Sequence, residues 1–387
     1  MQGETIATAD TIFRNTFNGQ AGKYMKICLI CSELFAWGKF GGFGRATRLI
    51  GRELVKRGVD VCAVVPRREN QKEVEVLDGI TVLSYPFSQT LTCSNLFKKC
   101  DADIFHSEQP SIATWIARKA MPQKKHIITF QDPKGWHDWL LELVSPSLNN
   151  LRASLAWAYE NNFLVTKALN QSDGLYYCAR YLQEKIPRVY RIHKPIEFLP
   201  TPVHLPENRI VKSRQPTVCF VGRWDRRKKP ERFFALAQKN PHIRFIAPGK
   251  SQDNVWDAHL RSKYGFLPNL EMPGFLNQFS SNSLSQILSK SWILVNTSTR
   301  EGLPNAFLEA LAHRCALLSV VNPENLTERY GHVIENEDFS GGLNNLLTDS
   351  RWKEKGEAGF AYVSRHYELH KAIDMHMTIY EKILGKA

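Results

Sequence analysis

Residues 25–66 read "MKICLICSELFAWGKFGGFGRATRLIGRELVKRGVDVCAVVP", and this stretch contains the pattern that indicates the fold class. It begins with an apolar run of strand length and continues through a glycine-rich loop. Apolar side chains at positions 46, 49, 50 and 54 then lie on one stripe of a helix. Gly58 is placed to end that helix, and a second apolar run follows it. The stretch therefore predicts a βαβ unit and, with it, a parallel sheet.

The same alternation of strand-like and helix-like segments occurs in both halves of the chain. The first half continues with "DADIFHSEQ", "KHIITFQD" and "SDGLYYCA", and the second half restarts at "TVCFVG". Five of the 19 prolines lie within residues 195–216, which is typical of a linker. A chain of 387 residues is also long for a single core. We predict an α/β protein with two doubly wound, Rossmann-like domains facing a central cleft, formed by residues 25–200 and 201–370.

The two ends of the chain are expected to behave differently. Residues 1–24 lack the apolar core of a secretion signal and precede the first strand pattern, so we predict a poorly ordered leader. Residues 371–387 are predicted to form a C-terminal helix that crosses back to the first domain. No apolar run approaches the roughly 20 residues that a membrane span needs. A cytoplasmic location is therefore expected.

Cysteine usage agrees with a reducing compartment. Most of the eight cysteines stand alone inside apolar runs, such as Cys62, Cys219 and Cys315, which is how small buried residues are used. Cys28 and Cys31 form a C-x-x-C, but on a strand positions three apart face opposite sides. We expect neither a disulfide framework nor a redox or metal role for this pair.

The charge of the chain predicts an anionic partner. A hydrophobic content of 43% and a charged content of 23% are those of an ordinary globular protein, but the net charge is +13. Nucleic acid, an anionic membrane face or a phosphorylated small molecule would all fit such a charge. The aromatic residues fall on apolar stripes and do not alternate with a basic groove, which disfavours nucleic acid.

The first segment with chemical potential is "GKFGGFG", residues 38–44. Glycines such as Gly41 and Gly42 let a ligand approach the backbone closely, and the helix start behind them is a natural seat for phosphate. The segment matches neither the G-x-G-x-x-G of dinucleotide sites nor the P-loop. A plain tight turn remains an alternative.

The second segment is "VGRWDRRKKPERFF", in which Gly222 ends a strand. Arg223 and Lys228 follow at the mouth of the crossover loop. A departing diphosphate accumulates negative charge, and a guanidinium and an ammonium that are already in place stabilise that charge. The other cations of the loop are interpreted as solvated. Gly249, at the end of "IRFIAPG", is added to the predicted donor-binding set.

The third segment is "STREGLPNAFLEALAHR", residues 298–314, which follows the strand-like "WILVNTS". Pro304 suits a first helical turn, and the backbone N–H groups around it can point at phosphate oxygens. The donor-binding set here comprises Gly302, Leu303, Pro304 and Asn305. Glu301 and Glu309 would repel phosphate but can accept hydrogen bonds from sugar hydroxyls. We therefore predict that two acids hold two sugars and that the backbone between them holds a diphosphate.

With these residues assembled, the chain resembles the retaining GT-B glycosyltransferases of family 4, also called glycosyl transferases group 1. The likeness runs from about residue 25 to the end, and "GGFGRATRLIGRELVKRG" is similar to the family's first loop and helix. It implies transfer of a sugar from a UDP-, GDP- or ADP-sugar, with retention of configuration and without metal or other cofactor. It implies that Arg223 and Lys228 hold the diphosphate, that Glu301 contacts the donor sugar, and that Glu309 contacts the ribose.

The amino-terminal half departs from the family pattern. The family often has a histidine pair after the third strand, whereas "FHSEQPS" keeps His106 but has Glu108 in the second place. The family also often shows a histidine before an aspartate, and here Gln131 precedes Asp132. Our candidates for the acceptor side are His106, Glu108 and Asp132. For His106, a hydrogen-bonded histidine in the core is an equally good interpretation.

Other interpretations remain open at this point. Asp101-x-Asp103 resembles a metal–diphosphate motif, but it lies just ahead of a strand, where aspartates commonly close turns. A sugar-nucleotide epimerase, a phosphorylase-like enzyme, or a non-catalytic basic binding protein would fit the same architecture. The expected acceptor is a carbohydrate or a lipid-linked glycan. The basic segments "ARKAMPQKKH" and "KIPRVYRIHK" could contact the inner face of an anionic membrane.

Overall fold

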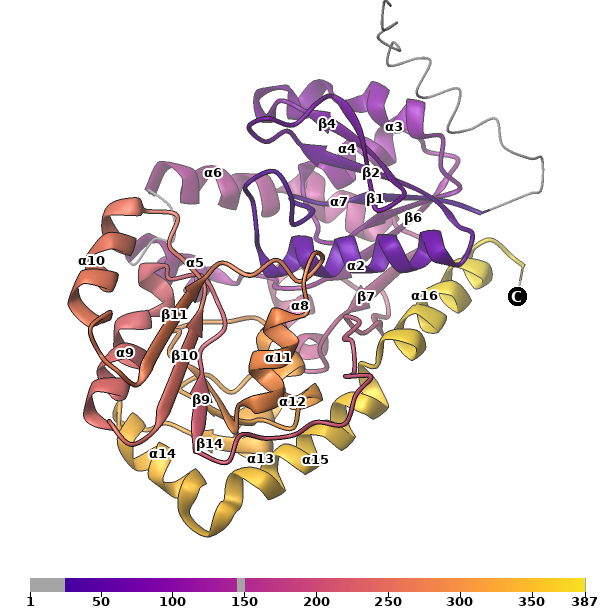
Figure 1. The fold of residues 1–387 in the computed structure, drawn as a ribbon. Helices are drawn as coiled ribbons and strands as arrows, with labels where there is room; N and C mark the ends of the chain where they lie inside the picture. Colours follow the sequence, from indigo (N-terminus) through magenta and orange to yellow (C-terminus); the bar gives the residue numbers. More distant parts are fainter. Residues whose placement is uncertain (1–24, 145–149, 387) are drawn as a thin grey trace, which may run out of the picture.

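The computed structural model describes residues 25–144 and 150–386, which form two α/β units, one above the other in Figure 1. The predicted leader, residues 1–24, lies outside the described residues. The predicted fold class, two doubly wound α/β units, is confirmed by the two sheets. The linker that joins the units runs from the end of the first sheet to residue 217, and the predicted domain boundary after residue 200 lies in it.

The first sheet has eight strands in the order β3-β4-β2-β1-β5-β6-β7-β8. All neighbouring strands are parallel except β3, which pairs antiparallel with β4. The strands are β1 (Lys26–Ile30), β2 (Asp60–Pro66), β3 (Val74–Leu77), β4 (Ile80–Tyr85), β5 (Ile104–Ser107), β6 (Lys125–Phe130), β7 (Gly174–Tyr177) and β8 (Glu197–Phe198). The α-helices of this unit are α2 (Gly42–Lys56), α3 (Ser94–Cys100), α4 (Ile112–Ala120), α5 (Trp136–Val144), α6 (Asn150–Glu160), α7 (Phe163–Gln171) and α8 (Leu182–Tyr190).

The second sheet has six strands in the order β11-β10-β9-β12-β13-β14, all of them parallel. The strands are β9 (Thr217–Cys219), β10 (Arg244–Pro248), β11 (Leu270–Gly274), β12 (Ile293–Asn296), β13 (Ala316–Ser319) and β14 (Gly331–Val333). The α-helices that follow them are α9 (Pro230–Lys239), α10 (Asn254–Tyr264), α11 (Ser283–Lys290), α12 (Asn305–Ala312), α13 (Leu326–Tyr330), α14 (Phe339–Leu347), α15 (Arg351–His366) and α16 (Leu369–Ile383).

The first βαβ unit forms as its sequence pattern predicts. The four apolar stripe positions of α2 are all buried: Ala46, Leu49, Ile50 and Leu54. Gly58 adopts φ +80°, the left-handed conformation that glycine reaches at little cost and that ends the helix. The central strands are buried on both faces, which is why they read as continuous apolar runs in the sequence.

Each sheet has one topological switch point, a strand from which the following strands are added on opposite sides. In the first sheet β2 lies on one side of β1 and β5 on the other, and in the second sheet β10 and β12 flank β9. The loops that leave the carboxyl ends of such neighbouring strands open a crevice, and ligands of open α/β sheets bind there. The second crevice is formed by the loops after β9 and β12, which contain the predicted Arg223, Lys228 and Glu301.

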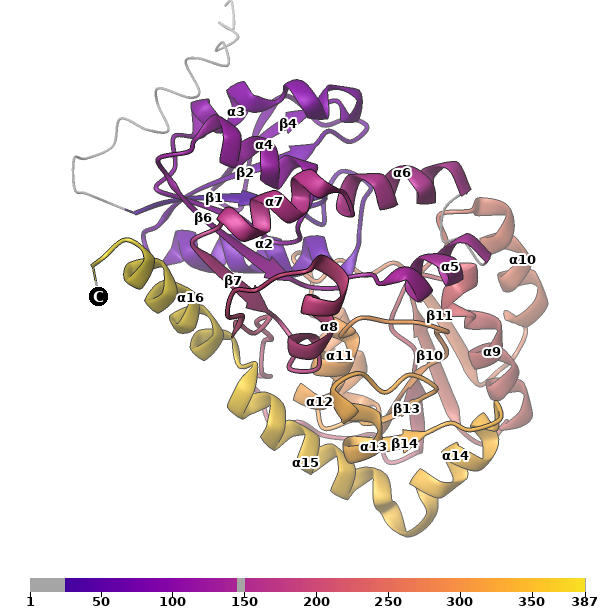
Figure 2. The same ribbon diagram turned by 180° about the vertical axis from the view of Figure 1, so that it is seen from behind.

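The last helix of the chain packs on the first domain. After α15 has covered the second domain, the chain bends and α16 packs against the C-terminal end of α2, as Figures 1 and 2 show from opposite sides. Leu369, Ile373 and Tyr380 of α16 are buried in the same apolar cluster as β1 and α2. The helix begins at Leu369 rather than at residue 371. Within the described residues, none of the helices has the length and apolarity needed to cross a membrane.

Candidate active site

Lys228 and Glu301 form an ion pair in the crevice of the second sheet. Their side chains are 21% and 10% exposed. The loops that carry them are joined by a hydrogen bond of 2.6 Å, which Thr297 Oγ1 donates to the carbonyl oxygen of Lys228. Asn296 Nδ2, at the end of β12, donates to Glu301 Oε1 at 3.2 Å. Two residues 73 positions apart in sequence are thus held together by neighbouring strands.

The ion pair determines the charge of Glu301. Burial alone would raise the pKa of this carboxyl group, but the charge of Lys228 and the hydrogen bonds from Lys228, Ser298 and Asn296 outweigh burial and lower it. Glu301 is therefore a carboxylate at neutral pH. It is an acceptor of hydrogen bonds rather than a proton donor.

Two further cations, Arg223 and Lys39, interact with each other across the two domains. Arg223 follows β9, and its Nη2 lies 3.1 Å from Asp225 Oδ2. Lys39 comes from the glycine-rich loop of the first domain, and its pKa is lowered by burial and by the charge of Arg223, although Glu33 opposes this shift. The crevice therefore has a cationic wall from the second domain and a partly buried ammonium from the first. Lys39 was not among the residues predicted from the sequence.

The glycine-rich loop touches the start of α12. Asn305 Nδ2 donates to the carbonyl oxygen of Gly42 at 2.8 Å. The structure gives Gly41 a different role from the predicted one, because a Cβ atom there would lie 1.8 Å from Glu33 Oε1. That carboxylate also accepts from Gly44 N at 3.2 Å. The N-terminus of α2, predicted to be a phosphate seat, is thus occupied by Glu33, and the glycine makes room for it.

Glu309 faces the first domain and holds one of its arginines. Arg45 Nη1, on α2, lies 3.0 Å from each carboxylate oxygen of Glu309. Burial raises the pKa of Glu309, and the charge of Arg45 reduces this shift. The carboxylate predicted to meet a ribose is therefore paired across the two domains.

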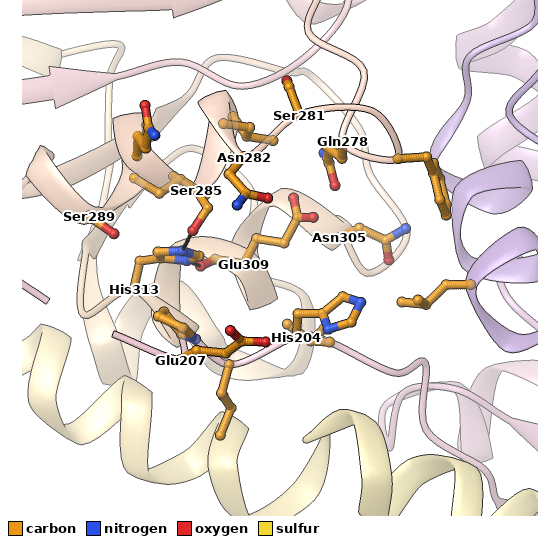
Figure 3. A pocket seen from close by; sticks show the side chains of 18 of the residues that line it. His204, Glu207, Gln278, Ser281, Asn282, Ser285, Ser289, Asn305, Glu309 and His313 are labelled. Atoms are coloured by element: carbon orange, nitrogen blue, oxygen red, sulfur yellow. Dashed lines mark hydrogen bonds between the residues drawn. The ribbon is translucent and has the colours of Figure 1, made fainter. Parts of the chain in front are cut away.

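A cavity of about 860 Å³ opens beside Glu309. Its walls come from α2, the linker, the loop before α11, α11 itself and α12. Figure 3 shows Glu309, Gln278 and His204 converging on it from three different segments. His313 closes one side, with Nε2 hydrogen-bonded to Ser285 Oγ at 2.8 Å. The cavity is rich in hydroxyl, amide and imidazole groups, which suits a polar ligand with several donors and acceptors.

Gly222 and Gly249 lie where the backbones of two strand ends approach closely. Gly249 N donates to the carbonyl oxygen of Gly274 at 2.8 Å, and Gly249 adopts φ +145°. A Cβ atom at Gly249 would lie 2.0 Å from the carbonyl oxygen of Gly222. These glycines shape the bottom of the crevice, and whether they contact a donor stays a prediction.

We expect Gly249→Ala to lower the free energy of unfolding by about 3 kcal/mol, because the added methyl group meets backbone and φ is unfavourable. Urea unfolding followed by circular dichroism measures the loss. Gly274→Ala is a matched control, since Gly274 also has positive φ but no atom within 4 Å of its Cβ position. Equal losses in the two variants would contradict the steric account.

The predicted acceptor-side residues are placed differently from expectation. His106 is fully buried, and its Nδ1 and Nε2 are hydrogen-bonded to Tyr380 Oη at 2.8 Å and Thr129 Oγ1 at 2.7 Å. Burial keeps its pKa well below the usual value, so the ring is neutral. His106 is a core histidine that joins β5 to α16, and its assignment to an acceptor site is corrected.

Glu108 and Asp132 are also engaged inside the protein. Glu108 is 3% exposed and accepts from Gln131 Nε2 at 2.9 Å, and burial raises its pKa to about 7. Asp132 accepts two hydrogen bonds from Arg300 of the second domain. The structure therefore gives Asp132 an interdomain partner in place of the predicted acceptor, and it leaves Glu108 beneath the surface.

The side chains considered for metal binding have other surroundings. Asp101 pairs with Lys124 at 2.9 Å. Asp103 Oδ2 accepts from the backbone N–H of Lys26 at 2.9 Å, so both aspartates have partners within the first domain. Cys28 and Cys31 lie in different apolar clusters, as the strand pattern predicted.

A cysteine cluster was missed by the sequence analysis. The sulfur atoms of Cys28, Cys62 and Cys100 lie within 4.8 Å of one another. They come from β1, β2 and the end of α3, so no local spacing could have signalled the cluster. All three belong to the apolar core between the sheet and its helices.

Two family models match the two halves of the chain. Residues 40–206 match the model of Glycosyltransferase Family 4, and residues 206–356 match that of Glycosyl transferases group 1. No curated protein sequence matches the chain.

Solved structures show the same fold at low sequence identity. Sucrose-phosphate synthase from Thermosynechococcus elongatus has a TM-score of 0.72 at 15% identity, over 94% of this chain and 100% of that one. Anabaena Alr3699/HepE in complex with UDP-glucose has a TM-score of 0.66 at 12% identity, over 94% and 100%. WaaG, a glycosyltransferase involved in lipopolysaccharide biosynthesis, has a TM-score of 0.63 at 17% identity, over 91% and 99%. Since the two family models together span residues 40–356, the chain belongs to the group 1 glycosyltransferases of family 4, which have the GT-B fold.

Proposed function

We propose that this glycosyltransferase moves a sugar from a nucleotide diphosphate donor to an acceptor hydroxyl, with retention of configuration. The observation that carries the proposal is the pairing of Lys228 with Glu301 at the carboxyl ends of the neighbouring strands β9 and β12, with Arg223 on the same loop as Lys228. In such a crevice, fixed cations can hold a diphosphate while a carboxylate accepts hydrogen bonds from sugar hydroxyls.

The diphosphate would lie between the cations and the start of α12. Pro304 is the N-cap of that helix, and its carbonyl oxygen accepts from Phe307 N, so the N–H groups that have no partner within the helix are those of Asn305 and Ala306. Arg223 and Lys228 would stabilise the charge that develops as the bond to the sugar lengthens. Since the protein supplies these positive charges itself, we propose catalysis without a metal ion or other cofactor.

The proposed transfer step does not need a protein base to take the acceptor proton. The bond between the anomeric carbon and the diphosphate oxygen breaks, and the acceptor oxygen forms its bond on the same face. The acceptor proton passes to the departing phosphate oxygen. The burial of His106 is consistent with this route, because a histidine base is then not required at the acceptor side.

The nucleoside would extend past Glu309 into the adjoining cavity. The carboxylate of Glu309 offers two oxygens to ribose hydroxyls, and about 860 Å³ beside it gives room for a base. Similar structures were solved with UDP-glucose and with UDP and GlcNAc, so UDP-sugars are the first donors to test, ahead of GDP- and ADP-sugars. A carbohydrate or lipid-linked acceptor, reached from the cytoplasm at an anionic membrane face, suits the net charge of +13.

Binding is tested by thermal shift with UDP, GDP and ADP and with their sugars. A ligand that binds the folded state raises its apparent stability. Glu309→Gln is expected to weaken the preferred nucleoside diphosphate by about 10–100-fold, the range for hydrogen bonds to a charged group. Glu357→Gln is the matched control, because Glu357 also pairs with an arginine, at 3.0 Å, but outside the cavity. Unchanged affinity in Glu309→Gln would contradict the ribose assignment.

Product analysis separates the remaining candidates. Free nucleoside diphosphate together with a glycosylated acceptor of unchanged anomeric configuration supports the proposal. An epimerised nucleotide sugar indicates an epimerase, and a sugar phosphate indicates a phosphorylase. Tight donor binding without turnover on any acceptor indicates a binding protein.

A further inference from the structure

A buried ion cluster joins the two domains directly beside Glu301. Arg300 Nη1 and Nη2 donate to the two carboxylate oxygens of Asp132 at 2.9 and 2.6 Å. Arg300 Nε donates to Asp138 Oδ1 at 2.7 Å. The side chains of Arg300 and Asp132 are only 9% and 8% exposed, so little water competes with these bonds. One arginine of the second domain thus holds two aspartates of the first.

The first-domain side of the cluster is itself anchored. Asp138 Oδ2 lies 2.8 Å from Lys185 Nζ and accepts from Gly135 N at 2.9 Å. Burial alone would raise the pKa of Asp138, but the bonds from Arg300 and Lys185 outweigh burial and lower it to about 2. Asp138 is therefore a carboxylate at neutral pH.

The residue on the other side of Glu301 meets the same aspartate. A Cβ atom at Gly302 would lie 3.1 Å from Cβ and Cγ of Asp132, so the backbone there packs against this side chain. Both sequence neighbours of Glu301 are consequently held by Asp132. The loop that carries Glu301 therefore contacts the first domain on both sides of Glu301.

Two of the other polar contacts between the domains are of a different kind. Arg45 pairs with Glu309, and Asn305 binds the backbone at Gly42, where the proposed donor lies. An arriving donor must compete with these contacts for the same groups. Arg300, Asp132 and Asp138 do not line the cavity beside Glu309, so their bonds can persist when it is filled.

We propose that Arg300 and Asp132 form a closure latch, which holds the domains together and thereby positions Glu301. They are positioning residues, and the role given to Glu301 rests on the proposed function. The latch couples domain closure to the completion of the active site. Without it the second domain keeps the walls of the nucleotide cavity that α11 and α12 supply, but Glu301 is no longer fixed against the first domain.

The latch is tested on the full chain with Arg300→Gln, which removes the charge, and with Arg300→Lys, which keeps it without the two-pronged geometry. Small-angle X-ray scattering gives the radius of gyration, titration with UDP gives nucleotide affinity, and kinetics give kcat and KM. We expect Arg300→Gln to be more extended, to bind UDP within threefold of the parent, and to lose at least tenfold in kcat. Arg300→Lys should have a radius of gyration and a kcat between those of the parent and those of Arg300→Gln.

Lys185→Gln is the matched control, because it removes a half-buried partner of Asp138 but leaves the Arg300–Asp132 bonds intact. Its radius of gyration and kcat should stay at the parent values. Asp132→Asn breaks the same pair from the other domain with little change in volume, and it replaces Arg300→Gln if that variant does not fold.

The possible outcomes separate the latch from the function. A radius of gyration and kcat unchanged in both Arg300→Gln and Asp132→Asn would overturn the latch, as would an equal opening of Lys185→Gln. Opening confined to the Arg300 and Asp132 variants, in a protein that shows no transfer with any donor, would support the latch as a domain contact and refute the proposed function.

Discussion

Lys228→Ala is expected to lower turnover by about 10²–10³, the scale for the loss of one preorganised charge contact in a transition state. Two causes act together. The ammonium no longer stabilises the departing diphosphate, and Glu301 loses the partner that keeps its carboxylate ionised and in place. The measurement is kcat at saturating donor on a purified, folded variant. Lys229→Ala, in the same loop but outside the ion pair, is the control and should keep the parent rate.

Stability measurements on the same pair distinguish the two causes. Removing one partner of a buried ion pair costs about 3–5 kcal/mol, because an uncompensated charge stays behind. The double variant Lys228→Ala/Glu301→Gln removes both charges and should recover most of the stability lost in Lys228→Ala. It should recover none of the turnover. Full activity in Lys228→Ala would contradict the assignment of the site.

Glu108→Gln is expected to stabilise the protein at pH 8 by about 3 kcal/mol and at pH 5 by about 1 kcal/mol. Burial raises the pKa of Glu108 from its usual 4.5 to about 7 in the folded protein. Below pH 4.5 both the folded and the unfolded state hold the proton. As the pH rises towards 7, the unfolded state releases it first, so the parent protein loses stability over this window. A glutamine carries no such penalty.

The comparison uses urea unfolding of both proteins at the two pH values. The neighbouring His106 stays neutral because burial lowers its pKa, so it adds no opposing charge over this range. Glu184→Gln, on an exposed face of α8, is the control and should show no difference between the two pH values. A stability gain for Glu108→Gln that does not change with pH would contradict the raised pKa of Glu108 as its cause.

The fold was predictable because its signals are local. The stripe of α2 and the apolar strands each lie within one short stretch, and parallel strands buried on both faces leave little choice of architecture. The crevice of the second domain was predictable for the same reason. Arg223 and Glu301 each follow closely on a strand, and neighbouring parallel strands bring their carboxyl ends together.

The amino-terminal candidates could not be judged in this way, because their partners are remote in sequence. His106 bonds to a tyrosine 274 residues away, and Asp132 bonds to an arginine 168 residues away. Glu33 likewise occupies the N-terminus of α2, whereas the glycine-rich sequence alone indicated that this helix start was free to bind phosphate. Whether a polar side chain faces a ligand or a distant partner is decided by packing, and a single sequence gives no measure of it.

The position of α16 has a consequence for how the protein matures during synthesis. Leu369, Ile373 and Tyr380 complete the apolar core of the domain that begins at the other end of the polypeptide. Chains emerge from the ribosome at about 5–20 residues per second, amino-terminal domains usually folding first. Here the first domain to be synthesised needs α16, the last helix of the chain, to complete its apolar core. The second domain of the nascent chain can therefore finish folding before the first.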